Sequence, residues 1–222
     1  MIEVRNLKVE NGNKSILKNT NFKWKNGLVY GIYGTRGAGK TAFLDILAGA
    51  SAHYDGAVLI NGFDIRTEPL KAREFIGYMP QNNALCEKMT PVEYLMYIAD
   101  VKGMGYEKAV RSISILLDIT GISPRRDCLI ENLSPFEKRC IGIAQASLGK
   151  SDILIFDEPW KGLSSHELQK ITNLLDFLSE NATLIVSSIQ KDLLNDICDR
   201  IFLLSDHALT EENQNLDAKE EN

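Results

Sequence analysis

The most specific chemical pattern in the chain is a glycine-rich stretch at residues 34–41, Gly-Thr-Arg-Gly-Ala-Gly-Lys-Thr. The pattern G-x-x-x-x-G-K-[ST] is typical of loops that bind nucleotide phosphates, because glycines let several backbone N–H groups approach the phosphate oxygens. Lys40 is placed to reach the β- and γ-phosphates, and the Thr41 hydroxyl is placed to bind Mg²⁺. The candidate ATP-binding residues are Gly34, Thr35, Arg36, Gly37, Ala38, Gly39, Lys40, Thr41 and Ala42.

The segments on either side of the loop support this interpretation. Residues 28–33 form an apolar, β-rich run, and the residues after the loop carry apolar side chains at helical spacing: Phe43, Leu44, Ile46 and Leu47. A strand, a loop and a helix in this order add the dipole and the unpaired N–H groups of the helix N-terminus to the loop. The alternative is a turn that only joins a strand to a helix, and the complete Gly-Lys-Thr motif argues against it.

Two carboxylates follow another apolar run. Residues 153–156, Ile-Leu-Ile-Phe, have the character of a buried strand, and Asp157 and Glu158 come directly after it. A carboxylate at the end of a buried strand is costly unless it has a partner, so we predict that Asp157 holds Mg²⁺. Glu158 is the candidate general base for a water near the γ-phosphate, although such a pair also suits a helix N-cap.

Gln81 is the remaining candidate, just past an apolar run at residues 75–79 that ends at Pro80. A side-chain amide at this place can contact Mg²⁺ or the attacking water, although a lone glutamine carries no signal by itself. The candidate catalytic residues are therefore Glu158 and Gln81, and the candidate Mg²⁺ ligands are Thr41, Gln81 and Asp157.

The elements that must position these residues predict an α/β fold. Alternating apolar residues over 2–9, the turn signal Asn11-Gly12 and the run 57–60 predict an N-terminal antiparallel sheet. Further apolar runs, at 184–186 and 201–204 as well as those already named, alternate with helical segments and predict a mainly parallel sheet covered on both faces.

A helical stretch at about residues 82–148 interrupts this alternation. Capping and periodicity predict helices over 90–103, 106–119 and 134–148 within it, and a further helix over 166–178. We expect one domain over residues 1–206, followed by an acidic, flexible tail over 207–222.

Composition limits which partners and which cellular compartment are expected for the protein. The 222 residues carry a net charge of −5, which argues against a nucleic-acid partner held by bulk electrostatics. No apolar run reaches the roughly 18 residues that span a bilayer, and no signal-peptide pattern opens the sequence, so a cytoplasmic protein is expected. The four cysteines are scattered without a C-x-x-C pair, which predicts reduced thiols.

Taken together, the loop at residues 34–41, Gln81 after residues 78–80, the Leu-Ser-x-x-Glu at 133–137 and the acidic run at 155–159 closely resemble the ATPase subunit of ATP-binding-cassette transporters. The resemblance covers residues 1–206. It implies a P-loop NTPase with a RecA-like core, an ATP and Mg²⁺ site, and two cassettes that sandwich ATP head to tail. It also implies a transmembrane permease as partner, docked near Gln81 and the helical insert on the inner face of the membrane. Residues 90–103 most resemble cassettes of exporters.

The sequence departs from the resembling family at the signature motif, where glycines are expected after Leu133-Ser134. The signature positions of this chain are instead occupied by Ser134, Pro135, Phe136 and Glu137. Pro135 has no N–H to offer a phosphate, and Phe136 adds bulk where close approach is needed. Loss of one charge-assisted hydrogen bond costs about 1.5–3 kcal/mol, so we expect a weakened contact with the partner cassette's ATP. Helix-start chemistry is nevertheless retained, with Ser134 as N-cap and Glu137 at N3.

Four other positions also depart from the family pattern. Ile189 aligns with the histidine that senses the γ-phosphate, and an isoleucine side chain cannot donate a hydrogen bond. Asn11 aligns with the aromatic residue that stacks on adenine, Ser164 with the aspartate of the dimer-contact loop, and Ala42 with a frequent second hydroxyl.

These departures leave three functions open. The first is an ATPase subunit that powers an exporter but hydrolyses ATP weakly on its own. The second is a nearly inactive ATP-binding subunit that regulates a heteromeric complex. The third is a soluble cassette that is not part of a transporter, which the absence of a second cassette and of a basic patch disfavours.

Overall fold

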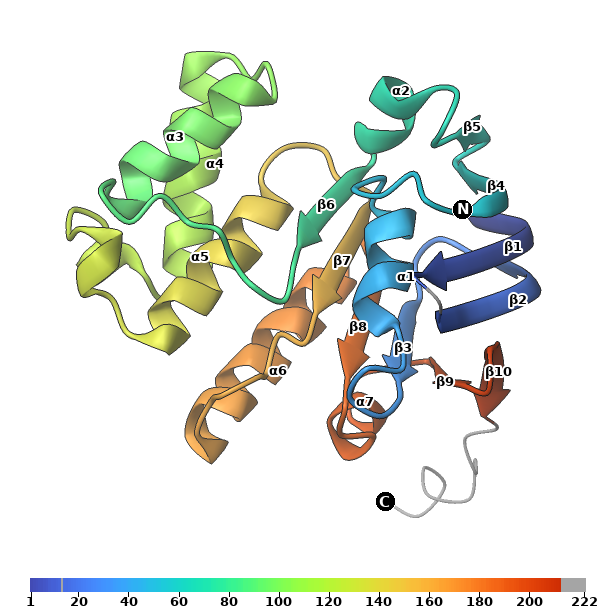
Figure 1. The fold of residues 1–222 in the computed structure, drawn as a ribbon. Coiled ribbons are helices and arrows are strands. Elements are labelled where there is room, and N and C mark those ends of the chain that lie inside the picture. Colours follow the sequence, from blue (N-terminus) through green and yellow to red (C-terminus); the bar gives the residue numbers. More distant parts are fainter. Residues whose placement is uncertain (13, 213–222) are drawn as a thin grey trace.

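The computed structural model describes residues 1–12 and 14–212, and the side chains of Asn11 and Lys14 lie outside this description. Two sheets with surrounding helices make up the fold (Figure 1). The first is antiparallel and has the strand order β2-β1-β4-β5. Its strands are β1 (Ile2–Asn11), β2 (Lys14–Trp24), β4 (Asp55–Ile60) and β5 (Phe63–Asp64). The predicted N-terminal antiparallel sheet is thus present.

The second sheet has the strand order β10-β9-β3-β8-β7-β6. The strands are β3 (Val29–Tyr33), β6 (Ile76–Met79), β7 (Ile153–Asp157), β8 (Thr183–Ser188), β9 (Arg200–Ser205) and β10 (Ala208–Glu212). All are parallel to their neighbours except β10, which runs antiparallel to β9. The loop after β3 and the acidic pair at the end of β7 therefore meet at one edge, where open α/β sheets bind ligands.

Strand β7 shows why its sequence is continuously apolar. Ile153 and Ile155 face the core shared with α1 (Lys40–Leu47) and the first sheet. Leu154 and Phe156 face the opposite core, shared with helices of the insert and of the C-terminal half. Successive side chains point to opposite faces of a strand, so a strand covered on both faces needs apolar residues at every position.

The predicted helices are present, with bounds within a few residues of those expected. Helix α2 was not predicted from the sequence pattern. The helices after α1 are α2 (Pro69–Arg73), α3 (Pro91–Val101), α4 (Tyr106–Ile119), α5 (Pro135–Ser147), α6 (Ser165–Ser179) and α7 (Asp192–Asn195), with 3-10 turns at Ser123–Arg125 and Ile130–Asn132. In Figure 1, α3 and α4 stand to one side, beyond β6, and α5 leads back toward the sheet.

Helix α5 packs very closely on β6. A Cβ added at Gly77 of β6 would lie 1.9 Å from the backbone oxygen of Ala146 in α5. A Cβ added at Gly142 would lie 2.2 Å from Nδ2 of Asn83, whose amide donates to the Lys138 backbone oxygen. The insert is therefore anchored to the parallel sheet at Gly77, where the facing backbone leaves no room for a Cβ, whereas a Cβ at Gly142 would displace the Asn83 side chain.

The C-terminal segment differs from the expected tail over 207–222. Residues 208–212 form β10, whose Glu211 pairs with Arg200 of β9, while Glu212 pairs with Lys191. Because these acidic side chains have cationic partners on neighbouring elements, a charged sequence forms an edge strand here. Residues 213–222 lie outside the described part of the chain.

Candidate nucleotide-binding site

The loop at residues 34–41 connects β3 to α1 in a conformation that requires glycine. Gly37 has φ 81° and Gly39 has φ 108°, in the region that residues with a Cβ rarely adopt. A Cβ on Gly39 would also lie 2.3 Å from Cγ2 of Ile16 in β2. The backbone of the loop is thereby held against β2, and the first N–H groups of α1 remain available for an anion.

Lys40 is buried at the base of this loop, with 7% of its surface exposed. Its ammonium group donates to the Gly34 backbone oxygen at 2.9 Å and lies 3.2 Å from Oε1 of Glu158. The structure thus brings together the predicted phosphate-binding lysine and the predicted general base. A buried cation of this kind is an electrostatic partner for phosphate oxygens.

Thr41 and Asp157 form a second contact between the two motifs. The Thr41 hydroxyl donates to Oδ2 of Asp157 at 2.6 Å, and the Ser187 hydroxyl at the end of β8 donates to Oδ1. Asp157 is fully buried. A hydroxyl beside a carboxylate offers the hard oxygen ligands that Mg²⁺ prefers, so the residues present fit this ion.

The predicted Mg²⁺ site has few protein carboxylates. Within the described part of the chain, no group of three or more His, Cys, Asp and Glu side chains is arranged to hold a metal. Mg²⁺ in nucleotide sites is held by one or two carboxylates together with substrate phosphates and water. The predicted ligand set of Thr41, Gln81 and Asp157 contains one carboxylate, within this range.

Glu158 is held in an uncommon backbone conformation, with φ 51°. Its N–H donates to the Ser187 hydroxyl at 3.0 Å, and its Oε2 accepts from the N–H of Ile189 at 3.3 Å. With Lys40 on its other oxygen, the carboxylate is positioned from both sides. A non-glycine residue at positive φ costs about 1–3 kcal/mol, and such positions are enriched at functional sites.

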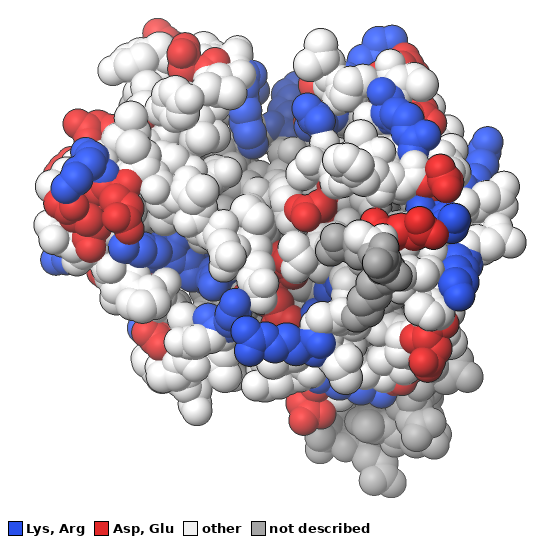
Figure 2. All heavy atoms as spheres, viewed as in Figure 1, with Lys and Arg blue, Asp and Glu red and all other residues white. Residues whose placement is uncertain are grey.

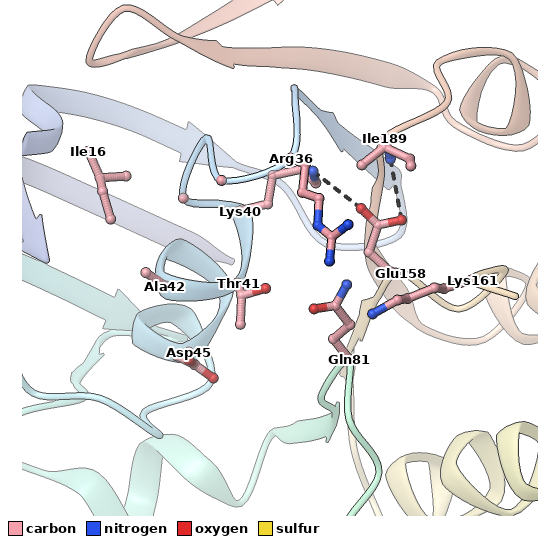
Figure 3. Close-up of a pocket in the computed structure, with 12 residues that line it drawn as sticks. Ile16, Arg36, Lys40, Thr41, Ala42, Asp45, Gln81, Glu158, Lys161 and Ile189 are labelled. Atoms are coloured by element: carbon pink, nitrogen blue, oxygen red, sulfur yellow. Dashed lines mark hydrogen bonds and ion pairs between the residues drawn. The ribbon is translucent and has the colours of Figure 1, made fainter. Parts of the chain in front are cut away.

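These groups open onto a cavity of about 600 Å³. Its lining residues are Ile16, Arg36, Gly37, Gly39, Lys40, Thr41, Ala42, Asp45, Gln81, Glu158, Lys161 and Ile189. Figure 3 shows the side chains of Arg36, Gln81 and Lys161 converging on the space beside Thr41 and Glu158. The cavity therefore unites the predicted loop, Gln81 and Glu158 in one site of a size that suits a nucleotide.

The segment that carries Gln81 is tied to α5. The Gln81 backbone oxygen accepts from Nη1 of Arg139 at 3.3 Å. Burial lowers the pKa of the Arg139 guanidinium, against the opposing effect of Asp157 and Glu158. Sequence reasoning missed Arg139, Ser187 and Lys161. Ser187 had one usable signal, as a hydroxyl that ends an apolar strand.

A sequence profile described as "ABC transporter" matches residues 17–161, which include the loop, Gln81 and the acidic pair. The chain belongs to the ABC transporter family. Its matching part is the ATP-binding cassette, and the architecture of a P-loop NTPase agrees with this assignment.

Relatives and solved structures support the assignment. The cassette is 31% identical to the linearmycin resistance ATP-binding protein LnrL of Bacillus subtilis over 205 residues, 92% of this chain and 66% of LnrL. It is 33% identical to the retinal-specific phospholipid-transporting ATPase ABCA4 of Mus musculus over 172 residues, 78% of this chain and 7% of ABCA4. The dimeric structure of MJ0796, a bacterial ABC transporter cassette, superimposes with a TM-score of 0.86 at 25% identity, over 96% of this chain and 98% of MJ0796. The chain spans about two thirds of LnrL and a small part of ABCA4.

The cassette's Leu-Ser-Pro-Phe-Glu positions lie at the start of α5, where Ser134 and Pro135 are exposed and Leu133 is buried, and none of them lines the cavity. Ser134 caps the helix: its hydroxyl accepts from the Glu137 N–H at 3.2 Å, and its own N–H donates to Oε2 of Glu137 at 2.7 Å. Phe136 is half-buried, with the Lys170 ammonium 5.6 Å from its ring centre. The expected capping box is confirmed, and Oε1 of Glu137 also lies 3.3 Å from Nε of Arg125 in the 3-10 turn Ser123–Arg125.

The other departures of the cassette have different surroundings. Ile189 lines the cavity and is 56% exposed. At the start of α6, the N–H and the hydroxyl of Ser164 donate to Oε2 of Glu167, at 2.8 and 2.6 Å. These hydrogen bonds lower the pKa of the Glu167 carboxyl. Ala42 lines the cavity without a polar side chain, and the side chain of Asn11 lies outside the described atoms.

Proposed function

We propose that this cassette binds ATP with Mg²⁺ on residues 34–41 and hydrolyses it to power an ABC transporter, through ATP-driven pairing with a second cassette. One observation carries the proposal: Lys40 and Thr41 contact Glu158 and Asp157 at the wall of a cavity of about 600 Å³. Phosphate-binding, metal-binding and proton-accepting groups thus share one site.

The residues of this site divide the chemistry among them. Lys40 and the loop N–H groups bind the β- and γ-phosphates, and Thr41, Asp157 and Gln81 hold Mg²⁺, which neutralises phosphate charge when bound. Glu158 accepts a proton from the attacking water. Because Lys40 pairs with Glu158 in the structure, a phosphate that draws Lys40 away also frees the carboxylate to act as base.

Hydrolysis by this cassette alone is proposed to be slow. The Ile189 side chain cannot donate to a γ-phosphate, and its N–H already donates to Glu158. At the start of α5, Pro135 has no N–H to donate to a phosphate, and the Ser134 N–H is already bound by Oε2 of Glu137. A single missing preorganised donor costs about a hundredfold to a thousandfold in rate.

The proposed partners follow from the same features. A second cassette with an intact signature would complete this cassette's ATP site, and the dimeric MJ0796 structure supports such pairing. A transmembrane permease is the second proposed partner, because the chain belongs to the ABC transporter family. The described residues themselves contain no helix long and apolar enough to cross a membrane. The cassette would then lie at the inner face of the membrane. The name of LnrL, a linearmycin resistance protein, supports an exporter.

A nucleic-acid partner is not proposed. Lys and Arg side chains are interspersed with Asp and Glu over the face shown in Figure 2. Nucleic-acid binding proteins instead gather basic side chains on one face.

Affinity for a fluorescent ATP analogue tests the proposed function. We expect the wild-type chain to bind the analogue with Mg²⁺, and Lys40→Ala to weaken binding by about a hundredfold, since Lys40 serves two phosphates. Lys150→Ala is the matched control, because Lys150 is exposed and outside the cavity. Failure of the wild-type chain to bind, or equal binding by Lys40→Ala, would contradict the proposal.

A regulatory subunit that binds ATP without cutting it is the second candidate, favoured by Ile189 and Pro135. Transport by the reconstituted complex separates the two functions. If Glu158→Gln leaves transport unchanged while Lys40→Ala abolishes it, ATP binding alone is required. If both variants abolish transport, hydrolysis at this site is required.

A further inference from the structure

Lys161 projects into the nucleotide cavity from the turn that follows the acidic pair. The indole Nε1 of buried Trp160 donates to Oγ1 of Thr172 in α6 at 3.1 Å. The Lys161 N–H donates to the Glu158 backbone oxygen at 3.1 Å. These two contacts fix the backbone beside Lys161, so its side chain extends toward Gln81 and the centre of the cavity (Figure 3).

The Lys161 ammonium group is uncommitted, in contrast to that of Lys40. Lys40 pairs with Glu158, whereas no hydrogen bond or ion pair holds the Lys161 ammonium within residues 1–12 and 14–212. Of the two carboxylates that line the cavity, Glu158 faces Lys40 and Asp45 accepts a hydrogen bond from Tyr78. A lysine that points into a cavity without a carboxylate partner is suited to an anionic ligand.

The charge of the cavity agrees with this interpretation. Three cationic side chains line it, Arg36, Lys40 and Lys161, against the carboxylates Asp45 and Glu158. The whole chain, in contrast, has a net charge of −5. Among the side chains that line the cavity, cations therefore exceed carboxylates by one, and Lys161 supplies that excess; the buried carboxylate Asp157 lies behind Thr41 and is engaged by the Thr41 and Ser187 hydroxyls.

Lys161 also lies on the side of the cavity where another donor is missing. The Ile189 side chain is apolar, and the Ile189 N–H is occupied by Oε2 of Glu158. Gln81 and Lys161 are the donors that Figure 3 shows on this side, opposite the loop that carries Lys40. We propose that Lys161 binds the terminal phosphate of a nucleoside triphosphate held by residues 34–41. This inference rests on the proposed function, because the triphosphate must occupy the loop.

The test compares affinities for fluorescent ATP and ADP analogues in the presence of Mg²⁺. The variants are Lys161→Ala, Lys161→Arg and the exposed control Lys150→Ala. Lys161→Ala should weaken ATP binding about five- to tenfold and leave ADP binding within about twofold, because an exposed cation is partly screened. Lys161→Arg should retain most of the ATP preference, and Lys150→Ala should match the wild type.

The ADP measurement distinguishes a phosphate contact from a folding defect, since a disrupted site would lose both nucleotides. Equal losses for ATP and ADP, or no loss for either, would overturn the role of Lys161 while leaving the proposed function intact. Failure of the wild-type chain to bind either nucleotide would instead overturn the proposed function and this inference together.

Discussion

The two parts of the cassette that should contact ATP are built in different ways. Around residues 34–41, buried groups from distant segments contact one another, as Thr41 does Asp157 and Lys40 does Glu158. At the start of α5, Ser134 and Glu137 instead bond each other, and neither residue lines the cavity. The difference shows that the first site is specified by packing, whereas the second can change its ligand chemistry while its helix remains capped.

Restoring donors at the weakened positions should have the largest effect. We expect the triple substitution Ile189→His, Pro135→Gly and Phe136→Gly to raise ATP hydrolysis about a hundredfold or more, because it returns a side-chain donor and a backbone N–H to the ATP interface. Phosphate release at a protein concentration that favours pairing measures the gain.

Ile189→Leu is the control, since it alters the same position without adding a donor. A triple variant with the rate of the wild type would show that the start of α5 and Ile189 do not limit hydrolysis, and the contrast between the two parts would lose its functional meaning.

The next largest effect tests whether the body of α5 is as firmly packed as the phosphate loop. Gly77→Ala should destabilise the fold by about 3 kcal/mol, because its Cβ would lie 1.9 Å from the Ala146 backbone oxygen and neither backbone can move freely. Urea denaturation measures the change in unfolding free energy. Gly105→Ala is the matched control: Gly105 has φ −64° and nothing lies within 4 Å of its added Cβ, so a loss well below 1 kcal/mol is expected. Equal losses for the two variants would refute the close packing.

The sequence predicted the helices and strands around residues 34–41 well, but it predicted the contacts between distant segments poorly. The glycine pattern, the apolar run before Asp157 and the capping signals of α3 and α5 are local, so they predicted the elements and their order. The roles of Ser187 and Arg139 depend on which strand ends and helices become neighbours, and no local pattern encodes that. Strand β10 was missed for a related reason, since the negative charges of Glu211 and Glu212 are balanced only by Arg200 and Lys191 on neighbouring elements.

A tenfold change in ATP affinity is expected when a predicted Mg²⁺ ligand is removed. Thr41→Val removes the hydroxyl that donates to Asp157 and is proposed to bind Mg²⁺. ATP affinity should fall about tenfold with Mg²⁺ and change less than about twofold in EDTA. Thr210→Val, an exposed change in β10 away from the cavity, should leave both affinities unaltered. An equal loss of ATP affinity with and without Mg²⁺ would show that Thr41 contacts the nucleotide or supports the fold rather than binding the metal.

The smallest effect concerns the start of α5, where hydrogen bonds serve the helix. Ser134→Ala removes the cap that accepts from the Glu137 N–H, and should lower the free energy of unfolding by about 1 kcal/mol. Hydrolysis should stay within about twofold, because Pro135 and Phe136 already prevent close approach to a phosphate. Ser114→Ala on the exposed face of α4 is the control, and should not destabilise the protein, since alanine is the better helix former. A tenfold loss of hydrolysis at unchanged stability would instead show that the Ser134 hydroxyl still contacts ATP, and the two parts of the cassette would then differ in strength rather than in kind.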